Sequence, residues 1–177
     1  MLMVMEMEDK VKRKHPRMQG YDYSQAGYYY VTICTQDKLP ILSKIQAERE
    51  LAPAVIELSG KGRIIEDQLL ALQERYVFAR IDKYVIMPTH IHAIVVLSED
   101  AAGVNPRPTL TDIICAFKSL STRLCNMLDN VQGRKIWQAS FYEEVIRCES
   151  AYLQIWDYID GNPSKWHDDI YFAWSAS

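Results

Sequence analysis

Residues 84–96, YVIMPTHIHAIVV, place two histidines one residue apart in an apolar run that a core strand could have filled with valine and isoleucine. Side chains alternate across a strand, so His90 and His92 should project from the same face and reach one ligand. Ile91 should point the other way, into a buried apolar layer. The other residues expected in that layer are Val85, Ile94 and Val96. The pair therefore predicts a strand with one chemically special face.

The segments on either side of this strand predict an α+β fold. Pro88 removes a backbone donor and favours a turn between strands at 77–86 and 89–97. The other expected elements are strands at 28–36, 54–58 and 135–147 and helices at 60–76, 109–128 and 149–163. This order lacks the regular strand–helix–strand alternation of a doubly wound fold. It favours an antiparallel sheet covered by helices.

The composition is that of an ordinary globular protein. The chain has 177 residues, of which 49% are hydrophobic and 24% charged, which suits one folded core. Its four cysteines lack the close pairs of a zinc site and predict reduced thiols. The sequence has neither a secretory signal nor an apolar run long enough to cross a membrane, so a cytoplasmic location is expected. Nothing in the sequence decides between a monomer and a dimer.

The charge distribution gives two opposing indications about a nucleic-acid partner. The formal net charge of -3 argues against one, although local clustering matters more for phosphate binding. Residues 1–20 form a basic N-terminal arm that contains KVKRKHPR at 10–17. Its Lys12, Arg13 and Lys14 are candidate phosphate contacts. Such an arm is equally typical of a solvated terminus that keeps a protein soluble.

The two strand histidines are half of a possible cation site. Neutral imidazole is a common ligand of divalent metals. Histidines at this spacing also occur as hydrogen-bonded core residues, so the pair alone leaves both interpretations open. His15 and His167 are the other histidines, and no cysteine pair is available, which disfavours a structural zinc site.

The predicted helix at 149–163 carries a polar stripe. Gln154, Tyr158 and Asn162 are spaced i, i+4, i+8 and line up along one face. Taken singly, Tyr158 could be a packing residue and Asn162 a helix end before Pro163. Together with the histidines, a phenol and an amide oxygen form a set that would hold a hard cation loosely, with positions open to phosphate oxygens.

Two blocks of the sequence resemble a known family. MPTHIH at 87–92 resembles the HUH motif (histidine, hydrophobe, histidine), and WQASFYEEVIRCESAYLQIWDYIDGNPSKW at 137–166 resembles the C-terminal signature of the REP-associated tyrosine transposases, relatives of the single-tyrosine transposases. GYYYVTICTQDK at 27–38 and IICAFKS at 113–119 are similar to further blocks of that family. The chain departs from the family at Thr89, where relatives often have asparagine, and in its net acidic charge.

The resemblance implies a ferredoxin-like α+β core over residues 21–177, a single HUH transposase-like domain, and a DNA strand-transfer activity. It implies that His90, His92 and Asn162 bind Mg²⁺ or Mn²⁺ and that the two histidines act in catalysis. Tyr158 matches the nucleophile, which would form a 5′-phosphotyrosine. The expected substrate is single-stranded DNA with hairpin or palindromic repeats.

Four further basic residues are candidate phosphate contacts outside the arm: Lys118, Arg123, Arg134 and Lys135. Ordinary solvated charges would look the same in the sequence. Two other functions also stay open. One is a non-catalytic DNA-binding descendant of a transposase. The other is a metal-dependent phosphoesterase that uses a metal-bound water and does not need Tyr158.

Overall fold

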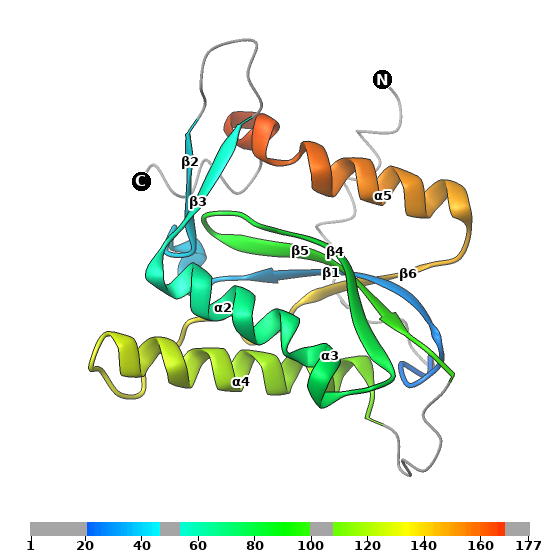
Figure 1. Ribbon diagram of the computed structural model, residues 1–177, viewed down its shortest axis with the longest axis horizontal. Helices are drawn as coiled ribbons and strands as arrows, with labels where there is room; N and C mark the ends of the chain where they lie inside the picture. The colour runs from blue at the N-terminus through cyan, green and yellow to red at the C-terminus, as the bar shows by residue number, and fades with distance from the viewer. Residues whose placement is uncertain (1–20, 47–53, 100–107, 169–177) are drawn as a thin grey trace.

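A computed structural model of the chain describes residues 21–46, 54–99 and 108–168 (Figure 1). The helices and strands are β1 (Gly27–Cys34), η1 (Gln36–Lys38), β2 (Ser43–Gln46), β3 (Val55–Leu58), α2 (Gly60–Leu70), α3 (Leu72–Arg75), β4 (Ala79–Ile86), β5 (His90–Leu97), α4 (Leu110–Leu128), β6 (Tyr142–Ile146), α5 (Glu149–Gly161) and η2 (Pro163–Asp168). The predicted basic arm, with Lys12, Arg13 and Lys14, lies outside the described residues. Within the described ranges, no helix combines the length and the apolar character that a membrane crossing requires.

The central feature is a four-stranded sheet in the order β4-β5-β1-β6, in which every neighbouring pair is antiparallel. Helices α2 and α4 lie on one face of this sheet and α5 on the other (Figure 1). A separate antiparallel pair is formed by β2 and β3. The predicted α+β sandwich, an antiparallel sheet with helices packed on it, is therefore confirmed.

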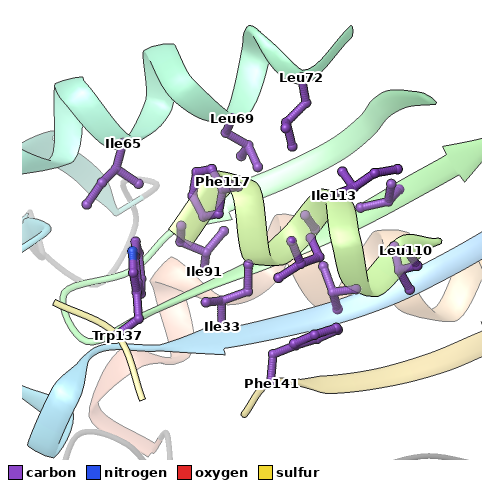
Figure 2. Packing of buried hydrophobic residues seen from close by; sticks show 14 of the residues in the cluster. Ile33, Ile65, Leu69, Leu72, Ile91, Leu110, Ile113, Phe117, Trp137 and Phe141 are labelled. Atoms are coloured by element: carbon purple, nitrogen blue, oxygen red, sulfur yellow. The ribbon is translucent and has the colours of Figure 1, made fainter. Parts of the chain in front are cut away.

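The larger core lies between the sheet and helices α2 and α4. Ile33 of β1 and Ile91 of β5 point into it, opposite Phe117 of α4 and Ile65 of α2 (Figure 2). All four side chains are completely buried. Full burial of a large aliphatic or aromatic side chain contributes roughly 1.5–3 kcal/mol, so this face supplies most of the driving force for folding.

The second core lies between the sheet and α5. It contains Ile94 and Val96 of β5 and Ile155 and Ile159 of α5. The prediction that Ile91 shares a layer with Val85, Ile94 and Val96 is wrong. A strand repeats every two residues, so Ile94 and Val96 lie on the histidine face, and Val85 stands directly opposite His92 on β4. Both faces of β5 are buried, which is why its sequence is almost continuously apolar.

Three elements differ from the sequence predictions. The helix expected at 60–76 ends at Leu70 and resumes as α3, because Ala71 has a ψ of -9° that breaks the regular helix. The strand expected at 135–147 is reduced to β6. Residues 138–140 direct their carbonyl oxygens to the ammonium of Lys118 instead of a neighbouring strand. Strand β2 was not predicted, since SKIQ is short and mostly polar.

Gly62 in the first turn of α2 is required by a close backbone approach. A Cβ at this position would lie 2.0 Å from the carbonyl oxygen of Leu42 and 3.3 Å from Cβ of Leu58. Gly62→Ala is therefore expected to destabilise the protein by about 1–3 kcal/mol, as overpacked sites do. The measurement is the urea midpoint at unchanged m-value.

Gly161→Ala is the matched control for this prediction, because nothing lies within 4 Å of a Cβ built at Gly161. It should be neutral or stabilising by up to about 1 kcal/mol, since alanine restricts the unfolded chain. Equal midpoints for the two variants would contradict the close approach.

Candidate metal and nucleophile site

Strand β5 presents His90 and His92 on the face covered by α5. The two ring centroids lie 4.4 Å apart, and the side chains are 0% and 2% exposed. The hydrogen bond from the Met87 amide to the His90 carbonyl closes the turn that contains Pro88. This tight connection between β4 and β5 sets where the first histidine stands at the end of the sheet.

Both imidazoles are held in the neutral form that binds metals. Burial lowers the pKa of His92 to about 3. The pKa of His90 lies well below its usual range, chiefly because of burial and secondly because of the nearby His92 and Lys38. At neutral pH each ring therefore has one nitrogen that carries a lone pair and is available to a ligand.

The Nδ1 atoms of the two rings face hydroxyl groups. Nδ1 of His92 lies 2.7 Å from the Tyr30 hydroxyl and 2.9 Å from Oγ1 of Thr32. Nδ1 of His90 lies 3.0 Å from Oγ1 of Thr89. Thr89 thus supplies a hydrogen-bonding oxygen at the position where the family that the sequence resembles often has asparagine. In each ring, Nε2 therefore lies on the side away from the hydroxyl that contacts Nδ1.

Helix α5 brings Tyr158 to the same face of the sheet. Ile155 and Ile159 are buried against the sheet and anchor the helix. The ring of Tyr158, which is half-buried, lies 5.2 Å from the His92 ring and 6.4 Å from the Tyr30 ring. The predicted juxtaposition of the phenol and the histidine strand is therefore present in the fold.

Asn162 follows directly after α5 and is 3% exposed. Its Oδ1 atom is buried and has no hydrogen-bond partner among residues 21–46, 54–99 and 108–168. Nε2 of His92 is also buried and has no hydrogen-bond partner within those ranges. Buried polar atoms are nearly always satisfied, so this unsatisfied oxygen and nitrogen are candidates to contact a ligand. Gln154, the first residue of the predicted stripe, is exposed.

The candidate donor set is small and would leave coordination positions of a bound cation open. In the part of the chain that the structure describes, no group of three histidine, cysteine, aspartate or glutamate side chains could hold a metal. The candidate set instead has two imidazoles and one amide oxygen, His90, His92 and Asn162. Such a set is too small for a closed structural site, and a cation bound by it would keep positions open for water or phosphate oxygens.

Three residues near the histidines were not singled out from the sequence: Tyr30, Thr32 and Trp166. The Trp166 ring, from η2, lies 6.1 Å from the His90 ring and covers it. Tyr30 and Thr32 reach His92 because β1 pairs with β5 in a register that places Thr32 opposite His92. Alternation along β1 indicates that Tyr30 and Thr32 share a face, but the partner strand is not readable from the sequence.

The four basic candidates outside the arm lie on α4 or just after it, on the side of the sheet opposite α5. Lys118, Arg134 and Lys135 line an open groove of about 430 Å³ between α4 and residues 133–139. Arg123 is exposed and does not line it. The structure therefore gathers three of the four, but not beside His90 and His92.

Two of these three cations are already engaged within the protein. Nζ of Lys118 donates to the carbonyl oxygens of residues 138–140 at 2.5 Å, 2.9 Å and 3.4 Å. Arg134 pairs with Asp129 at 2.6 Å and donates to Oδ1 of Asn126. Lys135 is exposed. Of the three, Lys135 is the side chain most accessible to an external phosphate.

Comparison with known proteins bears on the fold. No known protein-family model matches the chain. An uncharacterized protein of Haemophilus influenzae is 28% identical over 172 residues, which cover 89% of this chain and 91% of that protein. Among solved structures, a REP-associated tyrosine transposase bound to a REP hairpin is 21% identical, with a TM-score of 0.58. The match covers 84% of this chain and 73% of the transposase chain. The chain therefore shares the fold of a REP-associated tyrosine transposase.

Proposed function

We propose that this protein is a metal-dependent DNA strand-transfer enzyme that cleaves single-stranded or hairpin DNA through a 5′-phosphotyrosine. The observation that carries the proposal is the distance of 5.2 Å between the ring centroids of Tyr158 and His92. The buried, unsatisfied oxygen of Asn162, four residues after Tyr158, supports it. A phenol next to an open set of metal-ligating atoms is the arrangement needed for nucleophilic attack on a phosphodiester. The shared fold with a transposase bound to a REP hairpin supports DNA, and hairpin DNA in particular, as the substrate.

In this mechanism His90, His92 and Asn162 would hold Mg²⁺ or Mn²⁺. The bound ion would neutralise charge on the non-bridging oxygens of the scissile phosphate. Tyr158 attacks phosphorus in line: the bond from the phenol oxygen to phosphorus forms, and the bond from phosphorus to the 3′ oxygen breaks. The phenol proton is released and the 3′ oxygen is protonated. One phosphodiester replaces another, so the step is nearly isoenergetic and the 3′-OH can attack in reverse.

The sheet and the two cores give this chemistry a rigid support. His90 and His92 lie on a strand that is buried on both faces, so their positions are held by packing as well as by hydrogen bonds. Tyr158 lies on a helix whose buried residues, Ile155 and Ile159, set its depth and rotation. Positions held within about 0.5 Å are what an in-line displacement requires.

The direct test is covalent capture. The full chain is incubated with labelled hairpin oligonucleotides, including repeats from its own genome, plus Mn²⁺ or Mg²⁺. We expect a protein–DNA adduct on a denaturing gel, dependent on the metal and lost when the ion is removed with a chelator. Absence of an adduct across the whole hairpin panel, with either metal, would overturn the proposal.

Lys118 and Lys135 provide a prediction about how DNA is bound. Lys135→Ala should weaken hairpin binding and reduce the slope of log affinity against log salt by roughly 0.7–0.9, the value for one lost phosphate contact. Lys118→Met should leave that slope unchanged and lower stability by about 1–2 kcal/mol, because three carbonyl oxygens lose their shared donor. The measurements are fluorescence anisotropy in a salt series and urea unfolding. If only Lys118→Met reduced the salt slope, the result would contradict this prediction and show that Lys118 leaves its carbonyl partners to bind DNA.

A further inference from the structure

Two hydroxyl groups of β1 lie directly behind His92. The Tyr30 hydroxyl is 2.7 Å and the Thr32 Oγ1 atom 2.9 Å from Nδ1 of His92. All three side chains are at least 95% buried. Tyr30 and Thr32 reach the same nitrogen because residues two apart on a strand share a face and Thr32 stands opposite His92. This contact is built by the pairing of β1 with β5, far apart in the sequence.

The hydrogen bonds behind His92 favour one of its tautomers. Oγ1 of Thr32 donates its hydrogen to the Tyr30 hydroxyl at 3.2 Å. Having used its only hydrogen there, Thr32 can meet Nδ1 of His92 only as an acceptor. A proton on Nδ1 completes this network, with a chain of donors that runs from His92 to Thr32 to Tyr30. The remaining nitrogen, Nε2, holds the lone pair.

The burial of Nε2 supports the same assignment. This atom has no hydrogen-bond partner among the residues that the structure describes. A protonated Nε2 would be a buried donor with nothing to receive its hydrogen, which is costly. An unprotonated Nε2 is the form that binds a cation.

We propose that Tyr30 and Thr32 are positioning residues that hold His92 as the Nδ1–H tautomer, with its Nε2 lone pair presented to the metal on the α5 side of the sheet. The inference rests on the proposed function for the identity of the ligand, a divalent cation. The assignment of the His92 tautomer concerns the metal-free protein and can be tested separately. Ligating histidines depend on such outer partners for orientation, and loss of the partner lowers metal affinity roughly 10–100-fold.

Tyr30 also packs against both the proposed metal ligand and the proposed nucleophile. The ring stacks on His92 with a centroid distance of 5.6 Å and an interplanar angle of 24°. It meets the Tyr158 ring edge-on, at 6.4 Å and 88°. The hydroxyl of Tyr30 thus contacts the histidine, while its ring packs against the rings of both His92 and Tyr158.

The test uses variants that remove hydroxyls and keep shape: Tyr30→Phe, Thr32→Val and their double variant, with Thr32→Ser as the conservative rescue. In the metal-free protein, long-range ¹H–¹⁵N NMR should show His92 as the Nδ1–H tautomer, and the double variant should lose it. Titration with Mn²⁺ alone, followed by calorimetry, should show affinity roughly 10–100-fold weaker in the double variant and largely restored in Thr32→Ser.

Tyr29→Phe is the matched control. It removes a buried hydroxyl from the neighbouring residue of β1, one that donates to the Gln25 carbonyl on the opposite face and has no contact with His92. It should change neither the tautomer nor Mn²⁺ affinity. An Nε2–H tautomer in the wild type, or unchanged affinity in the double variant, would overturn the positioning role. If NMR shows the Nδ1–H tautomer but the wild type binds no Mn²⁺, the metal-binding part of the inference and the proposed function are both wrong. If the wild type binds Mn²⁺ but forms no DNA adduct, only the proposed function is contradicted.

Discussion

Tyr158→Phe is expected to eliminate the covalent protein–DNA adduct completely. The substitution removes one oxygen atom, the proposed nucleophile, and keeps the ring that lies 5.2 Å from His92. Stability and Mn²⁺ affinity should change little, because Tyr158 is only half-buried and is not one of the proposed ligands. The measurement is adduct yield on a denaturing gel with the best hairpin substrate, alongside strand joining to a second oligonucleotide.

Tyr152→Phe is the matched control on the same helix. Its hydroxyl donates to Asp82 at 2.6 Å, outside the histidine site, so adduct yield should stay at the wild-type level.

The Tyr158→Phe variant also distinguishes the two catalytic mechanisms that the site could support. Continued DNA cleavage without an adduct would indicate a phosphoesterase that uses a metal-bound water, and would exclude tyrosine-mediated strand transfer.

His92→Ala is expected to reduce both Mn²⁺ affinity and adduct formation by more than about 100-fold. Loss of a direct ligand should exceed the roughly 10–100-fold effect of losing an outer partner. The variant also leaves the buried hydroxyls of Tyr30 and Thr32 without their nitrogen, so a stability loss of about 1–3 kcal/mol should accompany it. Calorimetry with Mn²⁺ and the gel assay measure the first two effects, and urea unfolding measures the third.

Ile94→Val controls for the stability loss. Ile94 is the next residue on the same face of β5, and the substitution should cost about 0.5–1.5 kcal/mol without changing Mn²⁺ affinity. His90→Ala should behave like His92→Ala. A folded His92→Ala protein that binds Mn²⁺ as tightly as the wild type would remove His92 from the site.

The two faces of the central sheet have different roles in the site. The face toward α2 and α4 is packed with large apolar side chains and fixes the strands. The face toward α5 is also buried, but two of its positions are given to histidines, which are stable there as neutral rings. A polar site can be rigid in this fold because apolar cores pack on both faces of the sheet.

Much of the fold follows from patterns that are local in the sequence. Aromatic and β-branched residues in 27–34, a nearly continuous apolar run in 90–97 and a period-3.6 repeat in 110–128 are properties of neighbouring residues, and these elements are present in the structure. The helix start at Thr109 is local in the same sense, since its side chain and that of Asp112 cap each other. The error over Ile91 and Ile94 was avoidable, because strict alternation already places Ile94 beside the histidines.

Other features could not be read locally. Residues 135–141 have strand-like composition, yet the carbonyl oxygens of residues 138–140 accept from Lys118 of α4 instead of joining a ladder. The same contact shows why a list of basic residues does not identify a phosphate surface. Lys118, Arg134 and Lys135 are alike in the sequence, and only their partners in the fold distinguish a structural cation from an exposed one.

The α+β class, the projection of His90 and His92 from one face of a strand, and the alignment of Tyr158 with Asn162 along a helix are predictable from the amino-acid sequence, because each depends on spacing within one element. The roles of these residues in metal binding and attack stay predictions. The docking of α5 on the histidine face, the pairing of β1 with β5, and the contacts of Tyr30 and Thr32 with His92 emerge only in the folded protein. These pairings join segments about 60 residues apart, and their choice depends on how the whole chain buries its apolar surface.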